Sequence, residues 1–353
     1  MVAAQKLKCK EKKSVKRLRK HIGYLASDEL EGRSTGSEGE LLSAQYLANQ
    51  FDKLGLQPMG DDGSFLQEFS VVSLRLTMDQ GNTFKLGKES LSLFQDYYPL
   101  SYSANNASVK GNIVNCGFGI EAAGRNDFVN ELDGNIALID ISSPDGIHPH
   151  SKWAAYHGVQ IRVDKAIEKG ATGVIFYTKD QQIDEPSGEL SLKMSPSKIP
   201  VVYVSRDTKI DLTGNVELSV AIVTDSEEGH NVLAFIDNGA KHTVVIGAHH
   251  DHLGRGEHGG SLSNEISQIH NGADDNASGS AGLIELARVL RKGKKGINSN
   301  NYLIAAFSGE EMGLLGSKYL VNHLPFQLEQ TNYMLNMDMV GMLDSASKTL
   351  VIN

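Results

Sequence analysis

Residues of the kinds that bind metal ions gather in the C-terminal part of this 353-residue chain. His249 and Asp251 follow one apolar segment. Glu310 and Glu311 follow a second, and Asp338 follows a third. If the three segments are parallel strands, their carboxyl ends share one edge of the sheet, where ligands bind in open α/β sheets. We therefore expect these side chains to converge on one metal site.

His249 and Asp251 are two positions apart, so in an extended backbone both side chains point to the same face. One could bind a metal while the other orients it, because a metal-bound imidazole normally donates its second ring N–H to a carboxylate or a carbonyl. On its own the pair is a weak signal, since a histidine at a strand end is more often a hydrogen-bonded surface residue.

The segment 271–279 reads NGADDNASG and places two adjacent carboxylates in a turn that opens a helix. For Asp275 we favour capping of that helix and interaction with its dipole. We assign Asp274 to the metals, because the two oxygens of one carboxylate can bridge two cations about 3.5 to 4 Å apart, as in two-metal hydrolases.

Glu310 and Glu311 would be unpaired carboxylates at the end of a buried strand, where they repel each other and lose hydration. A metal that neutralises one of them, and a proton held by the other, would relieve both effects. One would then bind the metal, and the other would move a proton from water to the leaving amine. The alternative is that they are ordinary acids at the start of the following helix. Asp338, in NMDMVG, would be a terminal carboxylate ligand.

The overall composition excludes several classes of protein and several kinds of metal site. A formal net charge of −9 argues against a nucleic-acid binder, whose affinity comes largely from lysine and arginine. Two cysteines, Cys9 and Cys116, make neither a disulfide framework nor a thiolate zinc site, so a metal would be held by His, Asp and Glu. The longest apolar run is shorter than 18 residues, so we expect neither a membrane span nor an intact signal peptide.

The elements that must position these residues follow from hydrophobic periodicity. Residues 1–20 are rich in lysine and arginine and predict a solvated basic arm, and 21–54 read as helical. After edge strands or hairpins within 65–99 comes a β-rich unit. Its expected elements are strands at 135–140, 173–177 and 200–204 and a helix at 161–169.

Buried strands then alternate with helices, with strands expected at 243–248, 302–307 and 333–337 and helices at 277–290 and 314–321. This order predicts an α/β fold with a mostly parallel sheet flanked by helices. We expect four regions: the arm (1–20), the first part of the main domain (21–103), an inserted domain (104–225) and the site-bearing core (226–353).

GAHHDHLG, NGADDNASG, FSGEEMGLLGS and NMDMVG resemble, in order and spacing, the motifs of the M28 family of co-catalytic zinc peptidases. The resemblance implies a zinc-exopeptidase fold with two zinc ions. It implies that His249 and Asp338 hold one zinc, that Asp274 bridges, that Glu311 holds the other zinc, that Glu310 is the general base and that Asp251 supports His249. It also implies a cis peptide bond between Asp274 and Asp275.

Two further stretches resemble parts of the same proteins. DGNIALID, DKAIEKGATGVIFY and IPVVYVS resemble a protease-associated (PA) domain, and YLASDELEGR followed by GSEGE resembles the N-terminal helices of secreted bacterial members. The resemblance therefore implies a secreted or periplasmic protein.

The chain also departs from the family pattern. His250 stands where the usual motif, GAHYDHLG, has tyrosine, and we do not expect His250, His252, His258 or His270 to be ligands. The family's fifth ligand is a histidine well downstream of Asp338, and none follows here, so the second zinc would lack its histidine. Residues 349–353 read as the start of another strand, which suggests a chain cut within the domain.

The leading hypothesis is a metal-dependent aminopeptidase that removes N-terminal residues from peptide substrates, although this chain alone could be inactive. Two alternatives remain open: a single-zinc enzyme similar to glutaminyl cyclases, and a non-catalytic binding module built on the PA and peptidase folds. Side-chain specificity and oligomeric state are not indicated by the sequence.

Overall fold

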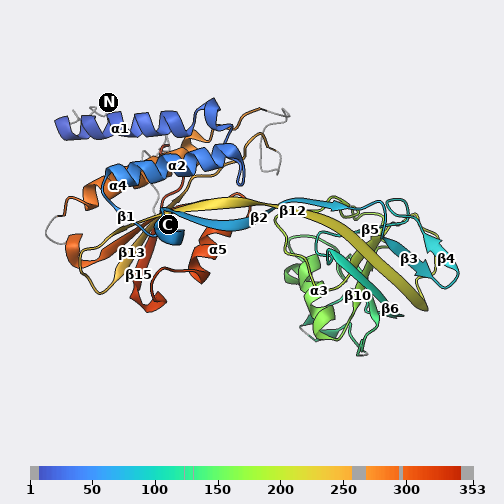
Figure 1. Ribbon diagram of the computed structural model, residues 1–353. Coiled ribbons are helices and arrows are strands. Elements are labelled where there is room, and N and C mark those ends of the chain that lie inside the picture. The colour runs from blue at the N-terminus through green and yellow to red at the C-terminus, as the bar shows by residue number, and fades with distance from the viewer. Residues whose placement is uncertain (1–7, 123, 130, 257–267, 294–296, 343–353) are drawn as a thin grey trace, which may run out of the picture. The chain divides into compact units, whose positions relative to one another are not determined.

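The computed structural model describes residues 8–122, 124–129, 131–256, 268–293 and 297–342 (Figure 1). The chain divides into two compact units. Unit 1 combines Met1–Val71 with Ser226–Asn353, and unit 2 is Val72–Asp225. The residues expected at the metal site all belong to unit 1.

A sheet with the order β15-β13-β14-β12 forms the centre of unit 1. β13 (Thr243–His249) pairs in parallel with β14 (Asn301–Phe307) and with β15 (Thr331–Asn336). The end of β12 (Asn215–Ile236) is antiparallel to β14, while β1 (Gln57–Pro58) and β2 (Leu66–Thr77) also pair with β12. All seven residues of β13 are buried, as its continuous apolar run predicts.

Helices cover both faces of this sheet (Figure 1). α1 (Cys9–Leu25), α2 (Glu38–Lys53) and α4 (Gly279–Leu290) share one apolar core with Val244 and Ile246 of β13. On the opposite face Val245 packs in a second core with Leu320 of α5 (Leu315–Asn322). The alternation of side chains along β13 therefore fills two layers. The expected α/β fold with a mostly parallel sheet is confirmed.

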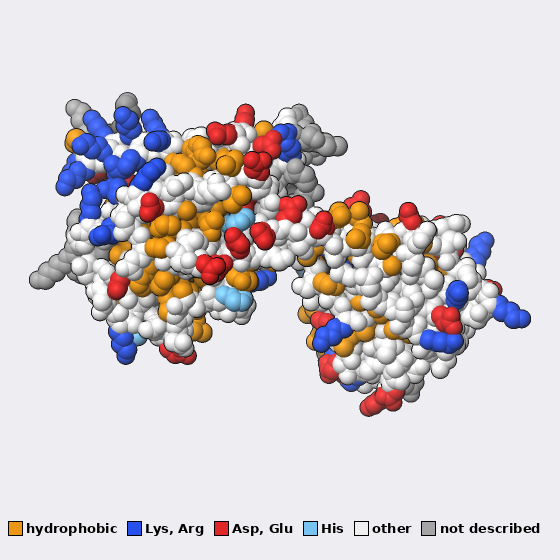
Figure 2. All heavy atoms as spheres, viewed as in Figure 1, with side chains coloured by type: hydrophobic (Ala, Val, Ile, Leu, Met, Phe, Trp, Pro, Cys, Tyr) orange, Lys and Arg blue, Asp and Glu red, His pale blue; other side chains and the backbone are white. Residues whose placement is uncertain are grey.

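Residues 9–20 of the expected basic arm are helical and form the first part of α1. Lysine and arginine side chains do gather over this helix (Figure 2). The helix nevertheless contacts α4 through an ion pair. Arg17 Nε and Nη2 donate to Oε2 and Oε1 of Glu285, at 2.8 and 2.6 Å. The helical stretch expected over 21–54 is interrupted between α1 and α2, where Glu31 and Arg33 adopt positive φ angles.

Replacing Glu285 by Gln is expected to lower the free energy of unfolding at neutral pH by about 1 kcal/mol. The effect is modest because Arg17 and Arg288, which form ion pairs with Glu285, are partly exposed and water screens these pairs. Burial alone would raise the pKa of Glu285, but hydrogen bonds from Arg17 and Arg288 hold this pKa well below its ordinary value. The contribution is therefore present above the unfolded-state pKa of about 4.3 and is lost as pH falls through the folded-state pKa.

Urea unfolding of wild type and variant at neutral and acidic pH checks this expectation, with Glu329→Gln as an exposed control. A stability difference that grows as the solution is made acidic would contradict it.

Unit 2 contains a second sheet with the order β6-β9-β10-β11-β5. Its parallel strands are β6 (Asn106–Asn115), β9 (Ile136–Asp140), β10 (Gly173–Tyr177) and β11 (Val201–Val204). The helix of this unit, α3, spans Val159–Glu168. The three strands and the helix expected within 135–204 are thus confirmed to within two residues.

The compact unit begins at Val72, whereas the inserted domain was expected to begin at 104. The difference arises because β5 (Tyr97–Pro99) pairs with β11, and β3 (Thr83–Leu86) pairs with β4 (Glu89–Leu91) and with the first part of β12. The first part of β12 also pairs with β6.

The remaining elements are short. They are the hairpin strands β7 (Glu121–Ala122) and β8 (Arg125–Asn126), and the helical turns η1 (Asp28–Leu30), η2 (Asp61–Gly63), η3 (Ala154–Tyr156), η4 (Ala273–Ser278), η5 (Ile297–Ser299) and η6 (Leu328–Gln330). Among the described residues, no helix is long and apolar enough to cross a membrane. The strand expected at 349–353 lies outside the described residues.

Candidate metal centre

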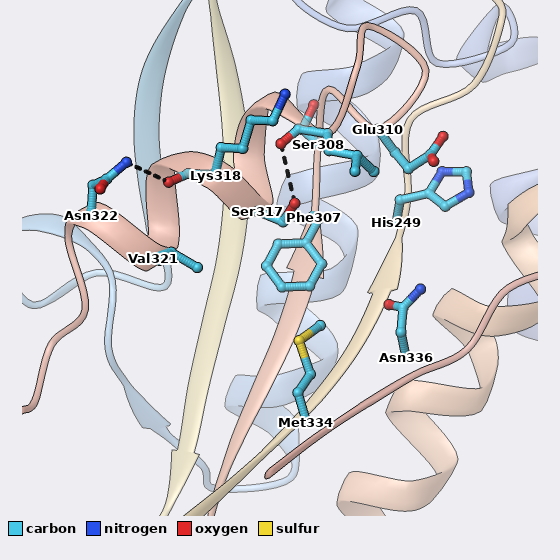
Figure 3. Close-up of a pocket in the computed structure, with 11 residues that line it drawn as sticks. His249, Phe307, Ser308, Glu310, Ser317, Lys318, Val321, Asn322, Met334 and Asn336 are labelled. Atoms are coloured by element: carbon cyan, nitrogen blue, oxygen red, sulfur yellow. Dashed lines mark hydrogen bonds between the residues drawn. The ribbon is translucent and has the colours of Figure 1, made fainter. Parts of the chain in front are cut away.

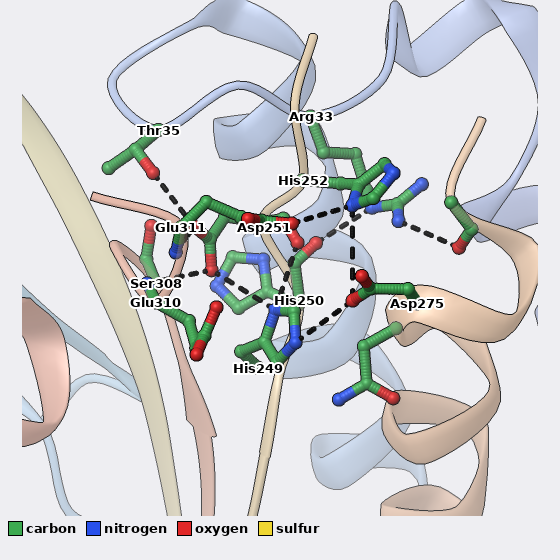
Figure 4. A network of polar contacts seen from close by, with 12 residues as sticks. Arg33, Thr35, His249, His250, Asp251, His252, Asp275, Ser308, Glu310 and Glu311 are labelled. Atoms are coloured by element: carbon green, nitrogen blue, oxygen red, sulfur yellow. Dashed lines mark hydrogen bonds and ion pairs between the residues drawn. The ribbon is translucent and has the colours of Figure 1, made fainter. Parts of the chain in front are cut away.

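β13, β14 and β15 are neighbouring parallel strands, so their carboxyl ends lie at one edge of the sheet. Figure 4 shows His249, Glu310 and Glu311 at this edge. His249 is the last residue of β13, and its side chain is only 2% exposed. Its Nε2 atom lies 3.4 Å from Oδ1 of Asp338, which follows β15. The loop after β14 contributes Glu310 and Glu311. The structure therefore places these residues together.

The turn before α4 contributes the carboxylate of Asp275, not that of Asp274. Oδ1 of Asp275 lies 3.2 Å from His249 Nε2. Oδ1 of Asp274 instead accepts hydrogen bonds from the backbone N–H of Gly341, at 2.7 Å, and from the Ser278 hydroxyl, at 3.2 Å. Asp275 thus faces His249 in the place expected for Asp274, because adjacent side chains in this turn point in different directions.

The cis peptide bond also lies one residue later than expected, between Asp275 and Asn276. The Asn276 side chain donates to the carbonyl of Met337, 2.9 Å away, and accepts from the backbone N–H of Gly279, 3.0 Å away. This amide therefore ties the turn both to the end of β15 and to the start of α4. No feature of the adjacent acids in the sequence distinguishes which of them faces the strand ends.

Two sets of three donor groups meet at this place, and Asp275 belongs to both. The first set is His249, Asp275 and Asp338, and the second is His252, Asp275 and Glu311. Within each set the potential ligand atoms lie within 4.8 Å of one another. Nδ1 of His252 is 2.9 Å from Oε1 of Glu311 and 3.9 Å from Oδ1 of Asp275. His252, which was not expected to be a ligand, is therefore a candidate donor.

Asp251 is fully buried and holds His249 in position. Nδ1 of His249 lies 3.1 Å from the carbonyl oxygen of Asp251 and 3.6 Å from its carboxylate. The carboxylate accepts hydrogen bonds from the Thr35 hydroxyl and from the backbone N–H groups of Glu310 and Glu311, at 2.9, 3.2 and 3.3 Å. The Nδ1–H is thus directed at Asp251, which leaves Nε2 free to face the other carboxylates.

Replacing Asp251 by Asn is expected to weaken metal binding about 10- to 100-fold, the usual effect of losing a carboxylate behind a metal-bound histidine. The amide keeps one acceptor oxygen where the carboxylate has two, and its NH2 group would face N–H and O–H donors. Isothermal titration with zinc measures the change, with the exposed Asp62→Asn variant as a control. Equal affinities in all three proteins would contradict the assigned role.

The carboxylates around His249 give the centre an excess of negative charge, which a bound cation would offset. Burial lowers the pKa of His249, but the carboxylates of Asp251, Asp275 and Asp338 outweigh burial and raise that pKa to about 12. An imidazolium would offset part of the negative charge, and a divalent ion would offset more. Imidazole nitrogens and carboxylate oxygens are ordinary zinc ligands. The residues present therefore fit zinc.

Glu310 stands apart from both donor sets, yet its side chain lies next to the His249 ring in Figures 3 and 4. Burial raises the pKa of its carboxyl group, and the carboxylates of Asp251 and Glu311 add to the rise. A cavity of about 470 Å³ opens beside it. Its lining includes His249, Phe307, Glu310, Leu314, Val321 and Met334 (Figure 3). The carboxyl group is thus placed to exchange a proton with a molecule in this cavity.

His250 points away from the metal centre. It is fully buried, with Nδ1 3.1 Å from the Ser43 hydroxyl and Nε2 2.9 Å from the His230 carbonyl. His270 has a backbone hydrogen bond to Gly254 and belongs to neither donor set. His258 lies outside the described residues. For His250 and His270 the structure gives no ligand contact.

Arg33 is a supporting residue that the sequence does not reveal. Its side chain is buried, and its guanidinium donates to the carbonyls of His250, Asn271 and Gly272 at 2.7, 2.8 and 3.1 Å, and to that of Leu25. These bonds connect the end of β13 with the turn that carries Asp275. Nothing in the local sequence distinguishes this arginine from a surface residue.

Family models match both units. Residues 231–352 match the model of peptidase family M28, and residues 93–212 match that of the PA domain. An aminopeptidase of Pseudomonas aeruginosa is 27% identical in an alignment of 348 residues that covers 93% of this chain and 57% of that protein. Aminopeptidase YwaD of Bacillus subtilis is 25% identical in an alignment of 333 residues that covers 93% of this chain and 62% of the relative. The chain therefore spans about three fifths of the length of these curated relatives.

Among solved structures, an aminopeptidase from Aneurinibacillus sp. strain AM-1 matches 92% of this chain and 70% of its own chain, with a TM-score of 0.50 and 24% identity. This likeness concerns the fold. A mostly parallel α/β sheet with imidazole and carboxylate groups at its strand ends is typical of a metal-dependent hydrolase. The site thus lies in a region that is similar to peptidase family M28, and unit 2 contains a region that is similar to the PA domain.

Proposed function

We propose that the protein containing this chain is an aminopeptidase that uses two zinc ions to hydrolyse N-terminal residues from peptides. The observation that carries the proposal is the position of Asp275, which lies in both donor sets at the strand ends. A carboxylate shared in this way is the usual bridge of a two-metal hydrolase. The aminopeptidases of Pseudomonas aeruginosa and Bacillus subtilis support the substrate class.

In this proposal each residue of the centre has a distinct task. His249 and Asp338 would hold one zinc, His252 and Glu311 would hold the other, and Asp275 would serve both. Bound zinc would polarise the scissile carbonyl group and acidify a water molecule. Glu310 accepts the proton of the attacking water and passes it to the departing amine. Asp251 orients His249, and Thr35 orients Asp251.

His252 was not expected to be a ligand, yet it belongs to the second donor set. His252 supplies an imidazole within reach of Glu311 and Asp275. Three protein donors with room for water are sufficient for a catalytic zinc site.

A single-zinc enzyme is the second candidate, because either donor set alone could hold one ion. The two candidates differ in the number of ions bound. Equilibrium dialysis of the whole protein against zinc, followed by elemental analysis, should find two ions per chain fewer in Asp275→Asn than in the wild type. A difference of one ion per chain in excess zinc would favour the single-zinc enzyme. If the protein is instead a non-catalytic module, it will release no product from aminoacyl-nitroanilides at any zinc concentration.

A further inference from the structure

His230 of β12 lies outside the metal centre and is fixed by a buried carboxylate. Glu40, in the first turn of α2, has no exposed surface. Its Oε1 accepts the backbone N–H of His230 at 2.9 Å, and its Oε2 lies 2.9 Å from Nδ1 of the same residue. Nδ1 therefore carries the hydrogen, and Nε2 is left for another partner. A carboxylate behind one ring nitrogen is the usual support of a metal-bound histidine.

Two further carboxylates converge on this imidazole. Glu68 on β2 and Glu228 on β12 each offer an oxygen that lies, with a ring nitrogen of His230, in a group spanning no more than 4.8 Å. Both glutamates are exposed, whereas His230 is only 7% exposed. Like charges this close on neighbouring strands repel each other unless a cation lies between them. The group thus combines an oriented, buried imidazole with two acids open to solvent.

We propose that Glu68, Glu228 and His230 form a further site for a divalent metal ion, distinct from the His249 centre. The two sites share no residue. One imidazole, two carboxylates and water form a donor set suited to zinc, whereas magnesium and calcium prefer oxygen ligands alone. The competing occupant is a proton on Nε2. Despite the lowering effect of burial, Glu40, Glu68 and Glu228 raise the pKa of His230.

The place of this site in the chain indicates a structural role. β2 and β12 pair with each other and are the two strands in which the chain passes from one compact unit to the other, after Val71 and after Asp225. Glu68 comes from β2, and the other two ligands come from β12. An ion bound here would link the two strands next to both crossing points and stabilise their pairing.

The test compares the wild-type protein with Glu68→Gln/Glu228→Gln, which removes the charges and keeps the shape of both side chains. Glu227→Gln/Glu329→Gln removes the same charge from exposed acids outside this group. Equilibrium dialysis against zinc should show one ion per chain fewer in the first variant than in the wild type and the control. Zinc should also raise the unfolding temperature less in that variant, while release of aminoacyl-nitroanilide product stays as in the wild type.

Equal zinc stoichiometry in all three proteins would overturn the proposal. Should the double variant fail to fold, the single variant Glu228→Gln is examined with cobalt, whose visible spectrum reports imidazole and carboxylate ligation. A cobalt spectrum unchanged by that substitution would also overturn the proposal. Failure of the proposed function would give a different result. The wild-type protein would then lack the ions assigned to His249 and His252 but would still lose one ion in the Glu68→Gln/Glu228→Gln variant.

Discussion

Replacement of Glu310 by Gln is expected to lower kcat for release of N-terminal residues about 10²- to 10⁴-fold, the range that general acid–base catalysis contributes. The amide has nearly the shape of the carboxyl group but cannot take up a proton from water. Glu310 belongs to neither donor set, so the substitution leaves the metal ligands in place. Its backbone N–H, which donates to Asp251, is also retained.

The measurement is hydrolysis of aminoacyl-nitroanilides by the whole protein with added zinc, accompanied by metal analysis of the same samples. Glu329→Gln, an exposed position, serves as the matched control. Equal kcat in wild type and Glu310→Gln would refute the assigned base. A loss of bound zinc together with activity would show instead that Glu310 is a ligand.

Replacement of Asp275 by Asn is expected to weaken binding at both metal positions by more than about 100-fold, since even residues behind the ligands account for 10- to 100-fold. The reason is that Asp275 is the one carboxylate present in both donor sets. An amide offers a single neutral oxygen and cannot bridge two cations. Peptidase activity should be lost with the ions.

Asp274→Asn is the matched control, because it makes the same chemical change one residue earlier. Its side chain accepts hydrogen bonds from Gly341 and Ser278, which an amide oxygen can also accept. We therefore expect nearly wild-type zinc affinity in this variant. Loss of zinc from Asp274→Asn, with retention in Asp275→Asn, would restore the assignment made from the sequence.

Much of the sheet that carries the centre could be predicted, because β13 and β14 are buried along almost their whole length and read as continuous apolar runs. The acids and the histidine at the ends of these two strands follow from this topology. α1 was missed because its lysines and arginines are typical of a solvated arm. The contact that holds it, between Arg17 and Glu285, joins residues 268 positions apart and leaves no local signal.

The details of the centre depend on backbone conformation that residue types do not determine. Asp274 and Asp275 are chemically identical, and only the turn before α4 decides which of them faces His249. His252 lies close to Glu311 while its backbone N–H donates to the carbonyl of Arg33, 3.0 Å away. Thr35 and Arg33 come from a segment more than 200 positions away from the residues they hold.

The central claim is that two metal ions share the carboxylate of Asp275. Diffraction data from zinc-loaded crystals of the whole protein, collected on both sides of the zinc absorption edge, test it most directly. Two anomalous peaks are expected at this centre, one bounded by His249, Asp275 and Asp338 and the other bounded by His252, Asp275 and Glu311. A single peak at the centre at saturating zinc, or a peak at Asp274 with none at Asp275, would contradict this claim.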